Sequence, residues 1–384
     1  MTGSLIFTLG LLEVVARLLH LGSGGFWEPS PLYGWQNIPN ARGWESCYGE
    51  CDTYVEINSR GLRDYEIPYE KPAGVQRLLF LGDSMTAGLQ VPLEQTFVKI
   101  LEANLQPAGD FETINAGTNA FGTDNELIFY RLEGVKYQAD IVVLSMYLAN
   151  DIYNNHHDLE TRISGSGHKP YFLFDENGEL ALQNFPVDGL DTFGIRFGTF
   201  LKRYFQLPRF LAQTLHLRAN VPEALRPLVE LAGGQRGGES DQDGTGGAAG
   251  RGVNICAAQY DPIIVEAWDL TKAIILQLRE EVAEHGARLV VLIIPASPQI
   301  VPPAEGEEWY CNRPDAEMAA FLEAEAIPSL DLLQAFRDHS LAGGEPLYFE
   351  RDFHMNPAGH ALAGDLLSRF FLEQLEIGGQ TNGG

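Results

Sequence analysis

The amino-acid sequence predicts an α/β domain whose parallel sheet is covered by helices on both faces. Short, nearly continuous apolar runs, as in strands buried on both faces, begin at Arg77 and read RLLFLG, FETINAG, ADIVVLSMYLAN and ARLVVLIIP. Segments that alternate with them, LEQTFVKILEANL and TDNELIFYRLEGVKYQ, have helical periodicity. Such alternation of buried strands and helices is typical of a parallel sheet.

Two further helices have marked ends. Asp261-Pro262 begins a long apolar-periodic stretch that ends at Gly286, which supplies an N-cap residue, a first-turn proline and a C-terminal glycine in order. Asn356-Pro357 is a helix start of the same kind. With 384 residues, 45% of them apolar, the chain can bury one large core with appendages.

The charge balance limits the classes of partner. The chain has 52 acidic and 26 basic residues, and its formal net charge of −26 repels phosphate backbones and anionic membranes at long range. We therefore expect no nucleic-acid partner. The four cysteines lack a CxxC pair and favour one or two disulfides outside the cytoplasm over a zinc site, with reduced, buried thiols as the alternative: Cys47, Cys51, Cys256 and Cys311.

The N-terminal part of the chain precedes the predicted domain. We interpret residues 1–22 as a signal anchor, because residues 5–21 are strongly apolar and are interrupted only by Glu13 and Arg17, at a spacing where the two can pair. An amphipathic helix packed on the domain is the alternative. Residues 23–76 form an accessory segment, with a short strand and turn in TYVEINSRGLRD.

The main domain spans residues 77–376 and contains an insertion or cap at 152–260, where the alternation of strands and helices stops. One helical face of the insertion forms an aromatic stripe of Phe193, Phe197, Phe200, Leu201 and Tyr204. Ordinary packing is the favoured interpretation of the stripe, with an acyl or glycan pocket or a lipid contact as alternatives. The glycine-rich residues 233–252 predict a flexible loop, and residues 377–384 a disordered tail.

Ser84 is the first candidate catalytic residue. It follows the apolar run LLFLGD among small residues, and the carboxyl ends of such strands border the ligand crevice of an open α/β sheet. The backbone after it can turn into a helix and offer N–H groups to a developing negative charge. The motif G-x-S-x-G is not met, because Thr86 replaces its last glycine, and a structural or phosphate-binding turn would look similar.

The C-terminal stretch ERDFHMNPAGHALAG supplies the base that a serine hydroxyl needs. Asp352 and His354 stand two residues apart, and side chains at this spacing share a face of an extended segment. We expect His360, one turn into the next helix, to be a packing or capping residue. Asn150, at the carboxyl end of the predicted strand ADIVVLSMYLAN, can donate a hydrogen bond to an oxyanion, with a turn-capping asparagine as the alternative.

Together these residues resemble the SGNH (GDSL) hydrolase family. GDSMTAG is similar to its first block with Ser84 as nucleophile, INAGTNAFGTDNEL to the second, LANDIYNN to the third with Asn150, and DFHMNPAGH to the last with Asp352 and His354. The resemblance implies a three-layer α/β/α, flavodoxin-like sheet of about five strands with an insertion or cap. INSRGLRD and the apolar N-terminus are similar to a bacterial, membrane-anchored subgroup, which implies an extracytoplasmic location.

Two positions depart from the family pattern. Counting from Asn115, Ala120 stands where the family has a glycine whose N–H joins the oxyanion hole, with Gly117 and Gly122 on either side. Alanine keeps the N–H but lacks the backbone freedom of glycine. The last block reads Asp-x-His, a shorter form that resembles the branch with polysaccharide O-acetyltransferases.

The resemblance implies a mechanism in which Ser84 attacks an ester carbonyl, His354 accepts its proton and Asp352 holds the imidazole. The oxyanion meets the N–H of Ser84, the N–H of Ala120 and the amide of Asn150. No metal or organic cofactor is needed. Asp352, His354 and His360, or His156 and His157, are metal-ligand types but have no recognised metal-binding spacing.

We predict a serine esterase that hydrolyses O-acyl groups, acetyl or another short chain, on a glycan or lipid-like substrate. An SGNH-type polysaccharide O-acetyltransferase and a non-catalytic cell-surface binding module are the alternatives. The expected partners are an acyl ester, such as an acetylated polysaccharide, and a membrane contacted through residues 5–21.

Overall fold

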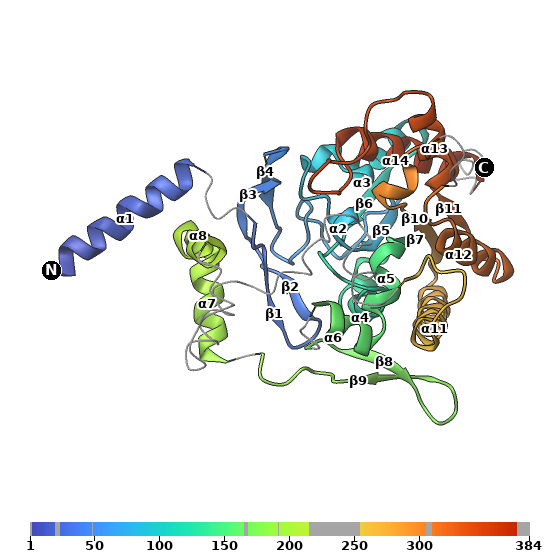
Figure 1. Cartoon of the computed structure of the whole chain (residues 1–384), viewed down its shortest axis with the longest axis horizontal. Helices are drawn as coiled ribbons and strands as arrows, with labels where there is room; N and C mark the ends of the chain where they lie inside the picture. Colours follow the sequence, from blue (N-terminus) through green and yellow to red (C-terminus); the bar gives the residue numbers. More distant parts are fainter. Residues whose placement is uncertain are drawn as a thin grey trace.

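The structure, a computed structural model, describes residues 2–19, 24–47, 49–164, 168–190, 192–214, 254–304 and 309–374. Its centre is a five-stranded parallel sheet in the order β11-β10-β7-β5-β6 (Figure 1). When the five strands are numbered along the chain and the sheet is read from β6 to β11, their order is 2-1-3-4-5, the flavodoxin-like arrangement. The strands are β5 (Gln76–Gly82), β6 (Phe111–Asn115), β7 (Ile141–Met146), β10 (Arg288–Ile293) and β11 (Ser329–Asp331).

Helices cover both faces of the sheet, so the predicted three-layer α/β/α architecture is confirmed. Alternate residues of β5 face opposite layers: Leu79 belongs to one apolar core and Leu78 to the other. The Leu79 side packs against α4 (Thr123–Leu132), α5 (Leu148–Asn154), α11 (Pro262–Glu284) and α12 (Arg313–Ala324). The Leu78 side packs against α3 (Phe97–Leu105), α13 (Leu333–Leu341) and α14 (Pro357–Arg369).

The predicted helix ends are also confirmed. Helix α11 begins at Pro262 after Asp261, and Gly286 follows its end with a positive φ of 78°. Helix α14 begins at Pro357, and the side chain of its N-cap residue, Asn356, accepts a hydrogen bond from the N–H of Gly359 at 3.0 Å.

The accessory segment forms two antiparallel hairpins, β1 (Trp27–Ser30) with β2 (Gly34–Asn37), and β3 (Arg42–Cys47) with β4 (Cys51–Glu56). Apolar side chains of this segment, Phe26 just before β1 and Val55 on β4 among them, pack against Ala87 and Leu89, which follow Ser84. The hairpins therefore lie against the part of the main domain that contains the candidate nucleophile.

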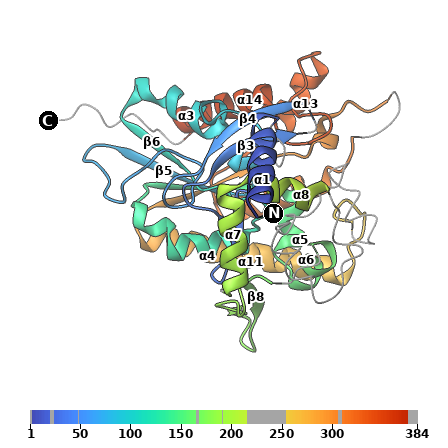
Figure 2. The same cartoon turned by 90° about the vertical axis from the view of Figure 1, so that its left-hand side faces the viewer.

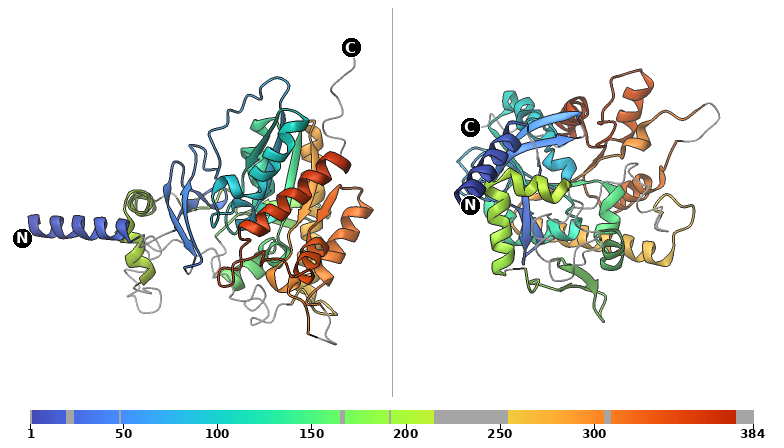
Figure 3. Two further views of the ribbon diagram at one scale, coloured as in Figure 1. Left: turned by 90° about the horizontal axis from the view of Figure 1, so that it is seen from above. Right: turned by 60° about the vertical axis from the view of Figure 1, so that its left-hand side comes forward.

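Helix α1 (Thr2–Leu18) projects away from the sheet, as Figures 1 and 3 show. The predicted pair within it forms, with Arg17 Nε 2.8 Å from Glu13 Oε1. Among the described residues, no helix has both the length and the apolar character needed to cross a membrane.

The predicted insertion contains α6 (His157–Ser164), the hairpin of β8 (Tyr171–Phe174) and β9 (Leu180–Gln183), α7 (Phe193–Tyr204) and α8 (Gln206–Thr214). Helix α8 contacts both α1 and α7, and the three helices lie on the side of the molecule away from the sheet (Figure 1), the side that faces the viewer in Figure 2. The predicted loop at 233–252 and the predicted tail at 377–384 lie outside the described residues.

The packing interpretation of the aromatic stripe is wrong. Phe193 is 83% exposed, and about half of each of Phe197, Phe200 and Tyr204 is exposed. Helix α7 thus turns an apolar face outward, and only Leu201 of the stripe is partly buried.

All four cysteines form disulfides, as predicted. Cys47 and Cys51, with Cα atoms 5.1 Å apart, close the tip of the β3–β4 hairpin. Cys256 and Cys311, with Cα atoms 5.0 Å apart, join the stretch before α11 to the stretch before α12.

Candidate active site

Ser84 begins the short helix α2 (Ser84–Ala87), directly after β5. It is the one residue between Arg77 and Val91 that is not buried. The turn from strand to helix is tight, since a Cβ atom at Gly82 would lie 2.2 Å from Thr86 Oγ1. The local sequence therefore brings a single hydroxyl to the surface at the carboxyl end of a central strand.

Three candidate residues from distant parts of the chain form one hydrogen-bonded chain. Ser84 Oγ lies 2.8 Å from His354 Nε2, and His354 Nδ1 lies 2.7 Å from Asp352 Oδ1. One tautomer satisfies both contacts: Nδ1–H donates to Asp352, and Nε2 accepts from the Ser84 hydroxyl. Nucleophile, base and orienting carboxylate have this arrangement in serine hydrolases.

The reason why Asp352 and His354 meet differs from the expectation. The segment is not extended, because Phe353 between them has a φ of 62°, in the left-handed region. Phe353 N–H donates to the carbonyl of Phe349, and Phe349 N–H donates to that of His354. A closed turn, rather than the alternation of an extended strand, brings the two side chains together.

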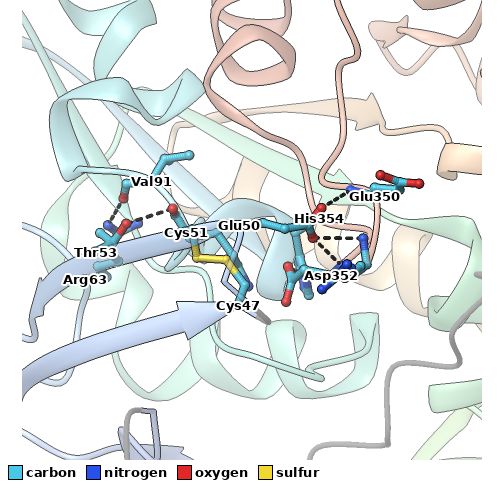
Figure 4. Close-up of a disulfide and its surroundings, with 11 residues drawn as sticks. Cys47, Glu50, Cys51, Thr53, Arg63, Val91, Glu350, Asp352 and His354 are labelled. Carbon is cyan, nitrogen blue, oxygen red and sulfur yellow. Dashed lines mark hydrogen bonds and ion pairs between the residues drawn. A yellow bond between two sulfur atoms is a disulfide. The ribbon is translucent and has the colours of Figure 1, made fainter. Parts of the chain in front are cut away.

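Glu50, at the tip of the β3–β4 hairpin, binds the backbone of this turn (Figure 4). Its Oε1 accepts from Glu350 N–H at 3.0 Å, and its Oε2 accepts from Arg351 N–H at 2.8 Å and Asp352 N–H at 3.2 Å. The sequence gives no local signal for this contact, because Glu50 lies in a different segment from the residues it binds.

The charges around His354 keep its pKa above the usual value. Burial alone would lower the pKa of His354, but the hydrogen bond and charge of Asp352, helped by the charge of Asp83, outweigh burial. Glu45 on β3 interacts with the same groups. Burial, followed by the charge of Asp352, raises the pKa of Glu45 to about 7, and one of its carboxylate oxygens is buried without a hydrogen-bond partner among the residues that the structure describes.

Asn150 contacts Asp83, the residue before the candidate nucleophile Ser84, but it lies on a different element than expected. Strand β7 ends at Met146, and Asn150 belongs to α5. Its Nδ2 donates to Asp83 Oδ2 at 2.9 Å, while Asp83 Oδ1 accepts from the N–H of Met85 at 2.8 Å. An amide nitrogen carries two N–H groups, so the second N–H of Asn150 can serve an oxyanion.

Ala120 has a backbone conformation that favours glycine. Its φ is 61°, and its carbonyl accepts from Asn154 Nδ2 at 3.3 Å. Gly117 is the glycine that the packing requires, since a Cβ atom there would lie 2.3 Å from the backbone nitrogen of Ala87. The second block thus approaches α2 closely through Gly117 and presents Ala120 in a left-handed turn.

The structure assigns contacts to INSRGLRD, for which sequence reasoning offered no role. The guanidinium of Arg63 is buried and donates to the carbonyls of Ala87 at 2.7 Å, Gly88 and Val91, as Figure 4 shows in part. These carbonyls belong to the end of α2 and the loop after it. Arg63 therefore holds the segment that follows Ser84.

Asp64 connects the accessory segment to the second block. Its Oδ2 accepts from Asn115 N–H at 2.7 Å, and its Oδ1 pairs with Lys99 Nζ at 2.8 Å. Asn115 Nδ2 in turn donates to the carbonyl of Thr86 at 2.8 Å.

Asn58 shapes the turn before these residues, since its Oδ1 accepts from the N–H groups of Arg60 and Leu62, both at 2.9 Å.

The other three histidines considered as candidates, His156, His157 and His360, do not contact Ser84 in the described part of the chain. His360 is buried, its Nδ1 accepts from Phe97 N–H at 3.2 Å, and burial lowers its pKa to about 3, so the packing interpretation is confirmed. His156 Nε2 lies 3.7 Å from Glu266, and His157 stacks on Tyr171. Within the described ranges, no group of three or more His, Cys, Asp or Glu side chains is arranged to hold a metal ion.

Comparison with protein families gives a match over most of the chain. Residues 80–362 match the GDSL-like Lipase/Acylhydrolase family, a range that contains Ser84, Asn150, Asp352 and His354. The chain belongs to this family, and the protein is an SGNH/GDSL-type hydrolase that acts on ester bonds. A search of curated proteins found no match.

Solved structures with a similar fold include the acetyl xylan esterase AlAXEase, at 12% identity and a TM-score of 0.38 over 76% of this chain and 97% of that one. A catalytic mutant of Axe2, an acetylxylan esterase from Geobacillus stearothermophilus, is similar at 12% identity and a TM-score of 0.38, over 79% and 94%. A member of the lipolytic protein G-D-S-L family from Veillonella parvula is similar at 12% identity and a TM-score of 0.37, over 78% of this chain and 99% of that one. Likenesses at this level carry no argument about the substrate.

Proposed function

We propose that the protein is a serine esterase that removes short O-acyl groups, acetyl above all, from a glycan or lipid-like substrate. The observation that carries the proposal is the continuous hydrogen-bonded chain from Ser84 through His354 to Asp352. A serine hydroxyl is a weak nucleophile until a correctly oriented base removes its proton, and this chain supplies both the base and its orientation.

The reaction proceeds in two halves. Ser84 Oγ attacks the ester carbonyl as His354 Nε2 takes the hydroxyl proton, and the imidazolium then returns that proton to the leaving alcohol. Water attacks the acyl-enzyme in the same way, with His354 as base, and releases the acid. The oxyanion of each tetrahedral intermediate accepts hydrogen bonds from the N–H of Ser84, the N–H of Ala120 and the second N–H of Asn150.

The test uses p-nitrophenyl acetate and acetylated oligosaccharides as substrates, together with a fluorophosphonate label for activated serines. We expect Ser84→Ala and His354→Ala to lose ester hydrolysis, and Ser84→Ala also to lose labelling, while both variants stay folded. Ser46→Ala, at an exposed serine of β3, is the matched control and should behave as the wild type. Equal hydrolysis by the wild type and Ser84→Ala would end the nucleophile assignment.

An SGNH-type O-acetyltransferase is the second candidate. The observation that favours it is the two-residue spacing at which Asp352 holds His354, the short form of the last block. Its first half-reaction is the same, and an acceptor alcohol replaces water in the second. Incubation of the acetyl donor with an oligosaccharide acceptor distinguishes the two candidates, since a transferase yields acetylated acceptor faster than free acetate.

We further propose that the protein works outside the cytoplasm, in association with a membrane. Two disulfides support the first part, because they persist in oxidising compartments. The second part is supported by residues 5–21, since helix α1 exposes many of its apolar side chains. Membrane fractionation, combined with protease accessibility in intact cells, tests both parts.

A further inference from the structure

A cavity with a volume of about 680 Å³ lies among α1, the junction of α7 and α8, and the β3–β4 hairpin, and it includes none of the candidate catalytic residues. We call it the arginine pocket, because four arginines and no acidic residue line it. In a chain with twice as many acidic as basic residues, this composition is unexpected by chance. Its lining residues are Arg17, Asn40, Arg42, Gly43, Trp44, Tyr54, Arg203, Tyr204, Phe205, Gln206 and Arg209.

The arginines of the pocket are held by the fold itself. Arg17 pairs with Glu13 and donates to the carbonyl of Tyr204 at 2.6 Å, while the buried Arg209 donates to the carbonyl of Gly24 at 3.2 Å. Burial lowers the pKa of Arg209 to about 10, with the charge of Glu13 opposing and that of Arg17 assisting the shift. The buried Nε of Arg203 has no hydrogen-bond partner among the described residues.

These observations indicate a site for an anion. Glu13 and Glu56 already pair with Arg17 and Arg42, whereas Arg203 Nε has no partner among the described residues. An anion that accepts hydrogen bonds from Arg203 and its neighbours would supply that partner and lower the remaining repulsion among the guanidinium groups. Guanidinium groups match the oxygens of a phosphate in particular, because two of their N–H groups can bind it in parallel.

The surroundings of the pocket indicate the kind of anion. Arg17 lies near the end of α1, whose exposed apolar side chains include Leu11, Val14 and Leu18. Tyr204, which lines the pocket, is also the last residue of the aromatic stripe. Residues 192–214 contain four basic and no acidic side chains: Arg196, Lys202, Arg203 and Arg209.

Apolar and aromatic side chains beside a cluster of basic ones are typical of surfaces that lie on membranes. We propose that the arginine pocket binds the phosphate-bearing headgroup of an anionic phospholipid, while α1 and the aromatic stripe contact the apolar part of the bilayer. Because the net charge of −26 repels an anionic surface elsewhere, this basic surface also determines which side of the molecule meets the membrane. The site is independent of the proposed ester chemistry.

Short-chain lipids that dissolve as monomers test the proposal on the full chain in neutral detergent. The probes are dihexanoyl phosphatidylglycerol, dihexanoyl phosphatidylcholine with the same acyl chains and no net charge, and glycerol phosphate without chains. Binding is measured by calorimetry and by tryptophan fluorescence, with Trp44→Phe identifying the signal that comes from the pocket. We expect phosphatidylglycerol to bind at least about tenfold more tightly than either of the other probes.

Arg203→Gln and Arg42→Gln should each weaken phosphatidylglycerol binding about tenfold and leave phosphatidylcholine binding unchanged, with melting temperatures confirming that both variants fold. Arg288→Gln, at an exposed arginine that begins β10, is the matched control.

Equal binding of the two lipids, or wild-type binding by both pocket variants, would overturn the proposal. Tighter binding of glycerol phosphate, or of an acidic oligosaccharide, than of phosphatidylglycerol would overturn the lipid assignment. Hydrolysis of p-nitrophenyl acetate by Arg203→Gln should equal that of the wild type, which separates this test from that of the proposed function.

Discussion

His354 is the residue whose proton the proposed chemistry moves, and its surroundings determine how activity depends on pH. As a base it must be neutral, and Asp352 and Asp83 raise its pKa above the ordinary 6.5 despite burial. We therefore expect kcat/KM to rise with pH through an apparent pKa above 6.5 in the wild type. The pH profile of p-nitrophenyl acetate hydrolysis measures this value.

Asp352→Asn removes the charge that raises the pKa of His354 and disturbs the tautomer that the carboxylate selects. We expect kcat/KM to fall by at least about a thousandfold, as for other Ser-His-Asp triads, and the remaining acid limb to move to lower pH. Asp338→Asn, at an exposed aspartate of α13, is the control. A wild-type profile in Asp352→Asn would remove Asp352 from the mechanism.

Asn150 tests the oxyanion assignment. The proposed hydrogen bond from Asn150 to the substrate strengthens as negative charge develops. Asn150→Ala should therefore remove roughly 3 kcal/mol of transition-state stabilisation, which lowers kcat and changes KM little. A rise in KM at unchanged kcat would instead place Asn150 in ground-state binding. Because Asn150 also donates to Asp83, melting temperatures of the variant are needed to show that the turn at Ser84 persists.

The sequence predicts much of the site at this scale because the family blocks are local. Ser84, Asn150, Asp352 and His354 are recognised within short motifs, and the structure brings Ser84, Asp352 and His354 into hydrogen-bond contact. The positive φ of Phe353 has no such motif, so the closed turn was missed. Contacts between segments far apart in the chain, such as that of Glu50, leave no mark on local sequence at all.

At the scale of elements, the β3–β4 hairpin positions the turn that holds Asp352 and His354. One carboxylate, Glu50, accepts from three successive backbone N–H groups of that turn. Glu50→Gln keeps the shape but loses the charge and one acceptor, so we expect kcat to fall about tenfold, with a smaller change in KM.

The matched control is Glu56→Gln, on the same hairpin, where the exposed glutamate pairs with the exposed Arg42 and makes no hydrogen bond or ion pair with the turn of Asp352 and His354 within the described ranges. Glu50→Asp, which keeps the charge on a shorter side chain, should recover part of the lost kcat. A stability change in Glu50→Gln without any change in kcat or in the pH profile would show that the contact is structural and does not position the base.

The strands and helices of the sheet were predictable because each carries its own pattern, whereas the placement of the accessory elements was not. Four apolar runs predicted β5, β6, β7 and β10, but β11 has only three residues, too few for a pattern. The aromatic stripe shows what a pattern cannot predict. Helical periodicity indicates that one face of a helix is apolar, but it is the same whether that face is buried or exposed. Which of the two is realised depends on what the fold places opposite, and α7 has its aromatic residues exposed.

At the scale of the whole molecule, several acidic side chains lie buried behind the site, and they couple stability to pH. The carboxyl group of Glu126 has no hydrogen-bond partner among the described residues, and burial, followed by the charges of Asp151, Asp83 and Asp124, raises its pKa well above 4.5. The raised pKa means that Glu126 keeps its proton in the folded protein at pH values where it is ionised in the unfolded chain, that is, above about 4.5. Stability therefore falls as pH rises from 4.5 towards the pKa of the folded state.

Glu126→Gln replaces this carboxyl with a neutral group of the same shape. We expect a smaller loss of the free energy of unfolding between pH 5 and pH 9 than in the wild type, with the largest gain at the alkaline end. Denaturant unfolding at several pH values measures the slope. Glu323→Gln, at an exposed position of α12, should leave it unchanged, and an unaltered slope in Glu126→Gln would contradict the expected protonation of Glu126.

The small disulfide between Cys47 and Cys51 has a consequence for the life of the protein in the cell. It closes the loop that presents Glu50, so reduction of these two cysteines would remove a covalent constraint on the residue that binds the turn of Asp352 and His354. A newly made chain in a reducing cytoplasm would lack this closure, and with the extracytoplasmic location proposed above the disulfide would form only after export. The hairpin would then couple catalytic competence to arrival in the compartment where the substrate lies.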